Sequence, residues 1–477
     1  MEYTELTGYH VPAGVVTTWI PTCPDEAWRD DPRGLSPAHE QHLAGGETGA
    51  WIGSVMRVPR AYDALALGRA LTAWTARHEV LRTTPAAGAD GWRRRTAPAG
   101  QVRVEPTEVG WVGSDHVNRY VGDFFAGVSP LRWPHCRFVT VLDPDADGGF
   151  VLAFGADHSV MDAYSQLLWF EEVLGLYDRA LAGASEAELA EHEVGSHVDF
   201  SDGDRSLALA LDADAAPVAR WREFLGDELA FPRLPVDGIE TTARLPQTTM
   251  SAWVADRDGA EAFTRACRAA GGSGQSGVLA AFSHAVRERH GVDRLRYILP
   301  MHTRDDAKDL AAVGWYVGLC PVDVDLSDLE PGATPRHAPA LLARAGAAVE
   351  AGRDLVRYPF ARVAALLGVT DVPHLAISYV DTRYVPGAAE WPQWQARALR
   401  STEHAGDEVY LWFIRSHEGL SVSARYPATL VAERTMRGLV ETFADTVARL
   451  SQPEVVPAPR VEVGIGAEVG IGSEATA

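Results

Sequence analysis

Basic side chains are outnumbered in this 477-residue chain, which has 43 Lys and Arg against 65 Asp and Glu and a formal net charge of −22. The acidic residues are spread along the sequence and form no single acidic tail. Because nucleic-acid binding depends on clustered Lys and Arg that neutralise phosphates, the composition argues against a nucleic-acid partner. The one dense basic run is Arg93, Arg94 and Arg95. We interpret it as a solvated strand edge; the alternative is a contact with the phosphates of a coenzyme or of a carrier-protein arm.

Cysteines are also few, and no two of them form a C-x-x-C pair, so their spacing predicts neither a zinc site nor a disulfide framework. The first residues, MEYTELTGYH, lack the basic and apolar regions of a signal peptide. No apolar run reaches the roughly 18 residues of a membrane span. We therefore expect a cytoplasmic protein without stable membrane insertion. The four cysteines are Cys23, Cys136, Cys267 and Cys320.

The motifs of several enzyme classes are missing as well. The chain has no G-x-S-x-G nucleophile elbow, no Walker A loop and no dinucleotide-binding fingerprint. Ser273 and Ser276, in the run GGSGQSG, are better explained as a turn and a helix start. The sequence therefore gives no reason to expect ATP, a nicotinamide cofactor or a bound metal.

Length and composition favour two lobes. A chain of 477 residues is too long for one ordinary core and suits two domains of roughly 200 residues each, with a cleft between them. Between about 184 and 245 the pattern loosens into Asp, Ala, Glu and Pro, as expected for a crossover. The last residues duplicate the unit EVGIG without aromatic or capping residues. We predict a first lobe over 1–205, a linker over 206–245, a second lobe over 246–455 and a disordered tail over 456–477.

Hydrophobic periodicity predicts that both lobes are of the α+β class. In the first lobe we expect a helix over 61–80, a hairpin of strands 138–142 and 150–156, and a helix over 163–182. The stripe of the first helix consists of Leu67, Ala70, Leu71, Trp74 and His78. In the second lobe we expect helices near 260–270, 276–290 and 338–351, strands near 295–300, 313–325, 374–381 and 409–425, and a closing helix over 430–450.

The segment from Asp157 to Ser165, DHSVMDAYS, carries the most chemical information. It lies where a buried strand gives way to a helix, a junction at which His158 can face a cleft. Asp162 follows four residues later and can organise the loop or cap the helix. Taken alone, H-x-x-x-D is a weak signal, and a structural His beside an N-capping Asp is the favoured interpretation.

The surrounding segments make a catalytic role of His158 the favoured interpretation instead. In order along the chain they are SPAHEQ (36–41), RHEVLRT (77–83), DHSVMD (157–162), HVDF (197–200), VGWYVG (313–318) and RYPF (357–360). Together they resemble the core motifs of the condensation domains of peptide synthetases and their stand-alone relatives, over roughly residues 36–450. Asp157 replaces the first His of the third motif, Ala163 replaces its Gly, and Gly318 stands where Asn is usual in the fifth. Two further segments, SYVDTR (378–383) and WFIR (412–415), look most like the polyketide-associated acyltransferases of actinobacteria.

This resemblance implies two chloramphenicol-acetyltransferase-like lobes in a V-shaped pseudo-dimer with a central tunnel. His158 would reach the middle of the tunnel as the general base, with no covalent acyl-enzyme. Asp162 would have a structural role in an ion pair with Arg304 of the other lobe. The candidates for lining the tunnel are Asp157, Ser165, Trp315, Gly318 and Tyr379.

The function implied is transfer of an acyl group from a thioester, carried by coenzyme A or a carrier protein, to a small-molecule hydroxyl in natural-product or lipid biosynthesis. One alternative is a stand-alone condensation enzyme that acylates an amine and forms an amide. Another is transfer at a membrane surface to a lipid acceptor. A third is a non-catalytic domain that docks a partner in the groove between the lobes.

Overall fold

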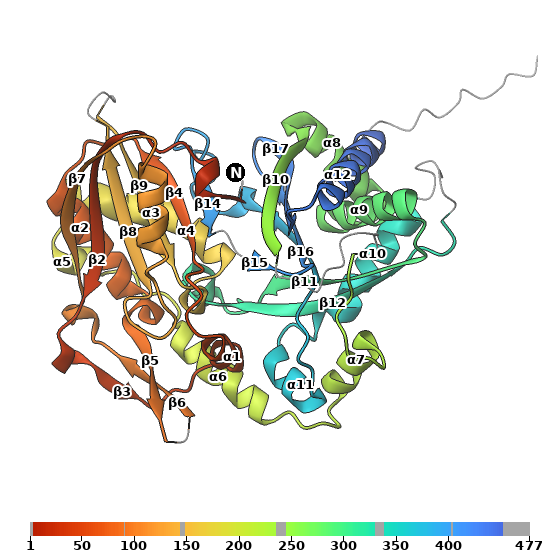
Figure 1. Cartoon of the computed structure of the whole chain (residues 1–477), viewed down its shortest axis with the longest axis horizontal. Helices are drawn as coiled ribbons and strands as arrows, with labels where there is room; N and C mark the ends of the chain where they lie inside the picture. Colours follow the sequence, from red (N-terminus) through yellow and green to blue (C-terminus); the bar gives the residue numbers. More distant parts are fainter. Residues whose placement is uncertain are drawn as a thin grey trace, which may run out of the picture.

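The computed structural model describes residues 3–89, 91–143, 148–234, 245–329, 338–401 and 404–451. The predicted tail over 456–477 lies outside the described residues. Two lobes lie side by side in Figure 1, the first drawn in red to yellow and the second in green to blue. Along the described residues, no helix is both long enough and apolar enough to cross a bilayer.

A seven-stranded sheet forms the centre of the first lobe, in the order β1-β14-β4-β9-β8-β2-β7. All neighbours are antiparallel except β1 and β14, which are parallel. A small second sheet has the order β3-β6-β5. The strands are β1 (Tyr3–Glu5), β2 (Gly14–Thr22), β3 (Arg29–Asp31), β4 (Ile52–Val58), β5 (Thr83–Gly88), β6 (Gly91–Thr96), β7 (Arg103–Val112), β8 (Cys136–Leu142), β9 (Phe150–Ala156) and β14 (Arg397–Arg400).

Helices cover both faces of the large first sheet. Successive side chains of a strand point to opposite faces. In β9, Leu152 and Phe154 therefore pack with α2 and α4, whereas Val151 and Ala153 pack with α3. The helices of this lobe are α1 (Pro37–Ala44), α2 (Ala64–Arg77), α3 (Val117–Phe125), α4 (Ala163–Leu181), α5 (Glu186–Leu189) and α6 (His197–Leu209), with 3-10 turns η3 (Glu79–Arg82) and η5 (His158–Val160). The predicted helix over 61–80, the hairpin and the helix over 163–182 are confirmed.

The second lobe repeats the plan with the strand order β12-β11-β13-β16-β17-β10-β15. Helices α8, α9, α10 and α12 share one core with this sheet, and α7 and α11 pack with Ile298 in a separate core. The helices and strands expected here from periodicity are all present. The elements of this lobe are β10 (Leu245–Asp256), β11 (Arg294–His302), β12 (Val317–Asp325), β13 (Leu375–Asp381), β15 (His404–Ala405), β16 (Val409–Arg415), β17 (Gly419–Pro427), α7 (Ala216–Leu225), α8 (Arg257–Ala269), α9 (Gly274–His290), α10 (Ala338–Arg353), α11 (Phe360–Leu367) and α12 (Leu430–Ser451). Of these, β10, β15, α7 and α11 were not predicted.

One strand crosses between the lobes. β14 belongs by residue number to the predicted second lobe over 246–455, yet it pairs with β1 and β4 in the first sheet. Its Ala398 and Leu399 are buried in the two cores of the first lobe, which explains why the strand is held there. The described part of the predicted linker, residues 206–234, is also more ordered than its loosened pattern indicated, because α6 extends into it and α7 lies within it.

The basic run on β6 differs from the prediction of a solvated edge. Arg93 is exposed, but Arg94 is buried between the small sheet and α6. Its guanidinium donates hydrogen bonds to the carbonyl oxygen of Gly34 at 3.0 Å and to Oγ of Ser201 at 2.9 Å. Arg94 therefore joins chain segments inside the lobe.

Candidate active site

His158 lies in a short turn whose two ends are fixed by carboxylates. Asp157 caps η5 and accepts a hydrogen bond from the amide N of Ser159 at 2.9 Å. Asp162 caps α4 and accepts one from the amide N of Ser165 at 2.7 Å. Side-chain caps of this kind satisfy amides that a helix start leaves unpaired. The backbone that carries His158 is therefore held on both sides.

The imidazole of His158 is half-buried and packs against an indole of the second lobe. Its ring centroid lies 4.6 Å from that of Trp315, with 49° between the planes. Burial lowers the pKa of His158 below its ordinary value of about 6.5, and this effect outweighs a backbone hydrogen bond that raises it. At neutral pH the ring is thus mainly uncharged, which is the state that accepts a proton.

Asp162 is the centre of a buried ion pair between the lobes. Arg304 donates to both carboxylate oxygens, at 2.7 and 3.0 Å, and both side chains are essentially inaccessible to solvent. Ser165 Oγ donates to the same carboxylate at 2.7 Å, and the amide N of Tyr316 donates at 3.0 Å. Burial would raise the pKa of Asp162, but Arg304 and these hydrogen bonds hold it below its ordinary value. The Arg304 guanidinium also lies over the rings of Tyr316 and Tyr164, at 4.4 and 4.9 Å.

The five-residue segment 312–316 is anchored at every position. This segment precedes β12 and carries Trp315. Arg304 donates to the carbonyl oxygen of Ala312, and the other four residues bond to side chains of the first lobe. These bonds run from the amide N of Val313 to His78 Nδ1 (3.4 Å), from the amide N of Gly314 to Ser165 Oγ (3.1 Å), between the Trp315 carbonyl and His197 Nε2 (3.1 Å), and from the amide N of Tyr316 to Asp162 (3.0 Å).

Asp157 forms a second polar pair beside the base. His42, in the last turn of α1, places Nε2 3.0 Å from Oδ1 of Asp157. The Asp157 side chain is 4% exposed and that of His42 is 29% exposed. The His42 ring also meets Trp315 edge to face, with centroids 5.6 Å apart. Two imidazoles, His42 and His158, therefore contact the same indole.

Gly318 and Tyr379 have other surroundings. A Cβ at Gly318 would lie 1.9 Å from the carbonyl oxygen of Val356, so glycine allows a close backbone approach there. Tyr379, on β13, packs in the core of the second lobe, and a Cβ at Gly274 would lie 2.9 Å from its hydroxyl. Among the contacts of the described residues, no hydrogen bond or ring contact joins either residue to His158. Asp157, Ser165 and Trp315, in contrast, all lie in the networks around it.

Three histidines of this arrangement were not predicted as site residues. His78 and His197 hold the segment 312–316, and His42 binds Asp157. His42 directly follows the first motif, and Asp157 stands where that family usually has a His. The His that follows the first motif and the Asp in place of the usual His are together the sequence signal for the pair. In the described part of the chain, no group of three or more His, Cys, Asp or Glu is placed to hold a metal ion.

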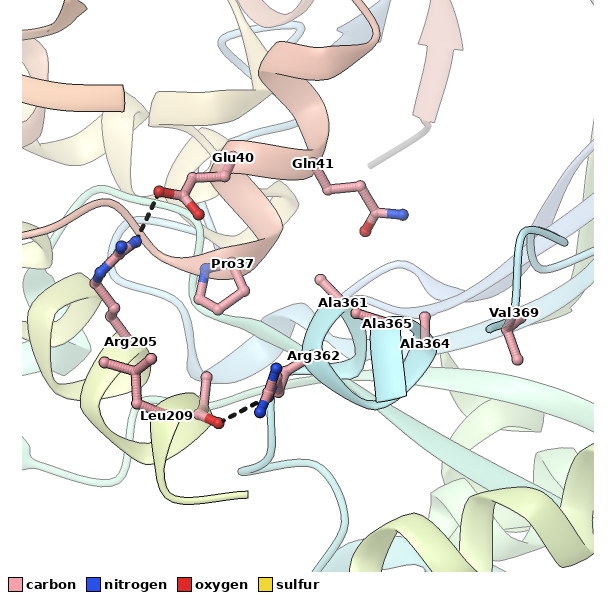
Figure 2. Close-up of a pocket in the computed structure, with 11 residues that line it drawn as sticks. Pro37, Glu40, Gln41, Arg205, Leu209, Ala361, Arg362, Ala364, Ala365 and Val369 are labelled. Atoms are coloured by element: carbon pink, nitrogen blue, oxygen red, sulfur yellow. Dashed lines mark hydrogen bonds and ion pairs between the residues drawn. The ribbon is translucent and has the colours of Figure 1, made fainter. Parts of the chain in front are cut away.

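A separate open pocket of about 420 Å³ lies between α1 and α6 on one side and α11 on the other (Figure 2). Glu40 and Arg205 form an ion pair of 2.6 Å at its edge, and Arg362 donates to the carbonyl oxygen of Ala208. His158 is not among its lining residues. These are Pro37, Glu40, Gln41, Arg205, Ala208, Leu209, Ala361, Arg362, Ala364, Ala365 and Val369.

A close contact inside the site gives a first prediction. A Cβ at Gly314 would lie 2.4 Å from the ring of His197, which itself packs against Tyr316. We expect Gly314→Ala to lower the free energy of unfolding by about 1–3 kcal/mol, the usual cost of overpacking. Urea denaturation measures this free energy of unfolding. The control is Gly175→Ala on α4, where a Cβ meets nothing within 4 Å and the helix should gain about 0.5–1 kcal/mol. Equal stability of Gly314→Ala and the parent would contradict the argument.

The chain is similar in sequence and in fold to known acyltransferases. No protein-family model matches the chain. The acyltransferase PapA3 of Mycobacterium tuberculosis is 23% identical over 334 residues, which cover 68% of this chain and 67% of that protein. Among solved structures, a PapA2 acyl transferase superposes with a TM-score of 0.81 at 19% identity, over 95% of this chain and all of the other. The chain is thus similar in sequence to PapA acyltransferases and shares the fold of a PapA2 acyl transferase.

Two further matches agree with this placement. The trehalose-2-sulfate acyltransferase PapA2 of Mycobacterium tuberculosis is 25% identical over 231 residues, 47% of each chain. The first condensation domain of the calcium-dependent antibiotic synthetase has a TM-score of 0.65 at 16% identity, over 88% of this chain and 96% of the other. The predicted α+β architecture of two chloramphenicol-acetyltransferase-like lobes is thereby confirmed. The division at 1–205, 206–245 and 246–455 stays a prediction, qualified by the position of β14.

Proposed function

We propose that this protein transfers an acyl group from a thioester to a hydroxyl group, with His158 as the general base. The observation that carries the proposal is the half-buried imidazole of His158, which is uncharged at neutral pH and lies where the two lobes meet at Trp315. A neutral imidazole with access to substrate is the group that this reaction needs.

The chemistry follows from that placement. The acceptor hydroxyl attacks the thioester carbonyl while His158 accepts its proton, and a tetrahedral oxyanion forms. Collapse of this intermediate forms the ester and releases a thiol. General-base assistance is typically worth about 10²–10⁴ in rate, and alignment of the two substrates adds to it. No acyl group is attached to the protein at any stage.

Asp162 and Arg304 support the base without exchanging protons. The carboxylate has no capacity left for a substrate, because it accepts hydrogen bonds from Arg304, Ser165 and Tyr316. The ion pair of Asp162 and Arg304 connects α4, the helix that begins after His158, to the segment that carries Trp315. We therefore assign the pair to positioning of His158 and Trp315.

The acceptor is proposed to be an alcohol. Support comes from the relative named as a trehalose-2-sulfate acyltransferase, since a sugar offers hydroxyl groups and no amine. The donor is a thioester of coenzyme A or of an acyl carrier protein, and no resident cofactor takes part. An amine acceptor would use the same base and give an amide.

Product masses test the proposal directly. The purified chain would be incubated with acyl-coenzyme A or acyl-carrier thioesters and a mixture of sugars, simple alcohols and amines. Ester masses that appear only with both substrates support it, and amide masses alone would replace it with the condensation alternative. A chain that binds a partner but consumes no thioester would instead be the non-catalytic docking domain.

The pH dependence of the rate gives a second prediction. Because the pKa of His158 lies below about 6.5, the base is already deprotonated at neutral pH. We expect kcat/KM to stay level between about pH 7 and 8 and to fall tenfold per unit once the pH drops below the lowered pKa. Initial rates across pH 4.5–8 measure the profile. A profile that falls off already above pH 7 would show that His158 is not the titrating base.

A further inference from the structure

The pair of His42 and Asp157 has the form of a proton-transfer dyad. The carboxylate of Asp157 is almost fully buried and bonds to Nε2 of His42 at 3.0 Å. Burial raises the pKa of Asp157, but the hydrogen bond and charge of His42, with the bond from Ser159, bring it down to about 2. Asp157 is therefore a carboxylate at any working pH. A buried carboxylate that bonds one nitrogen of an imidazole fixes the tautomer and stabilises the imidazolium when it forms.

Trp315 brings this dyad beside the proposed base. Trp315 packs with the ring of His158 at 4.6 Å and with that of His42 at 5.6 Å. The side chain of His42 is 29% exposed and residue His158 is partly exposed, whereas His39 of the same helix α1 is buried. With Nε2 engaged by Asp157, Nδ1 is the nitrogen of His42 that can meet a substrate.

The two imidazoles have different surroundings, as an acid and a base require. Burial favours the neutral ring of His158, and among the described contacts no hydrogen bond joins that ring to a carboxylate. His42, in contrast, bonds through Nε2 to the carboxylate of Asp157. Neighbouring titratable groups with opposed environments are the usual mark of an acid–base pair.

We propose that His42 is a second catalytic residue, which protonates the leaving thiolate, and that Asp157 is its positioning residue. This inference rests on the proposed acyl transfer and adds a step to it. As the tetrahedral intermediate collapses, the C–S bond breaks and its electron pair goes to sulfur. Sulfur takes the proton from Nδ1 of His42. His42 then regains a proton from solvent and His158 loses to solvent the proton it accepted, so the reaction overall converts an alcohol and a thioester into an ester and a thiol.

Leaving groups of different acidity test this role. An alkyl thiol has a pKa of about 8.5, so the C–S bond breaks more easily when the sulfur is protonated as it leaves. A more acidic aryl thiol departs as the anion and needs no proton. Each variant would be assayed with the coenzyme A thioester and the aryl thioester of the same acyl group. For His42→Ala and His42→Gln we expect kcat to fall about 10²-fold or more with the coenzyme A thioester, and less than about threefold with the aryl thioester. Asp157→Asn should show the same pattern with a smaller loss.

Control variants distinguish proton donation by His42 from the proposed acyl transfer itself. His116→Ala removes an exposed His that pairs with Asp115 at 2.8 Å, and both thioesters should react as with the parent. His158→Ala should lose activity with both. Equal losses of His42→Gln on the two thioesters, or no loss on either, would overturn the proton-donor role, while activity of His158→Ala equal to the parent would overturn the proposed function itself. Matching circular dichroism and melting curves of His42→Gln and the parent ensure that folding does not produce the difference.

Discussion

Replacing His158 by alanine is expected to lower kcat/KM for acyl transfer by about 10²–10⁴-fold, because the acceptor hydroxyl then loses the group that takes its proton. The ring lies in a turn whose caps are the side chains of Asp157 and Asp162 and do not involve the imidazole. The fold should therefore persist, and the melting temperature should change little. Thioester consumption in the presence of acceptor, measured at saturating donor, gives the rate.

The matched control for this variant is His284→Ala. His284 lies on α9 and pairs with Glu288 one turn along the same helix, at 3.4 Å. It should keep the rate of the parent. Turnover by His158→Ala at the rate of the parent would remove the imidazole from the mechanism.

Removing Asp162 is expected to produce the largest loss of stability. Asp162→Ala leaves the buried guanidinium of Arg304 without its carboxylate, and breaking a buried pair on one side typically costs about 3–5 kcal/mol. Tyr316 and Tyr164 still face the guanidinium and offset a part of this cost. Urea unfolding monitored by tryptophan fluorescence measures the change, and activity should fall as well because Trp315 loses its anchors.

An exposed pair of the same chemistry provides the comparison. Arg60 and Asp178 also form a two-point contact, at 2.8 and 3.0 Å, but their side chains are 39% and 43% exposed. Asp178→Ala should cost no more than about 1 kcal/mol. The double variant Asp162→Ala with Arg304→Met should be less destabilised than the sum of the single variants, since no lone charge remains buried. If Asp162→Ala and Asp178→Ala had equal effects, the buried pair would not be a structural anchor.

Local patterns in the sequence were sufficient for most of the helices and strands. The stripe on α2 and the apolar runs of β8 and β9 depend on residues close together in the chain, which periodicity reports directly. β14 could not be predicted in the same way. It has four residues, and its place depends on partners more than 300 positions away in sequence, β1 and β4. The buried position of Arg94 likewise depends on Ser201, which a basic run alone does not indicate.

The centre of the site was predictable because its residues cluster around a strand–turn–helix junction. His158, Asp162 and Ser165 lie within eight positions, and the resemblance to condensation domains pointed to Arg304 and Trp315. His42 was missed because its contact with Asp157 joins positions 115 apart and no local pattern reports it. Gly318 and Tyr379 stay tunnel candidates by motif alone. Gly318 lies against the carbonyl oxygen of Val356, and the hydroxyl of Tyr379 lies near Gly274.

The attachment of residues 312–316 limits how the two lobes can move. To separate along this segment, they would have to break the four bonds of residues 313–316 to the first lobe together with the buried Asp162–Arg304 ion pair. Substrates must therefore reach His158 while the two lobes stay joined here.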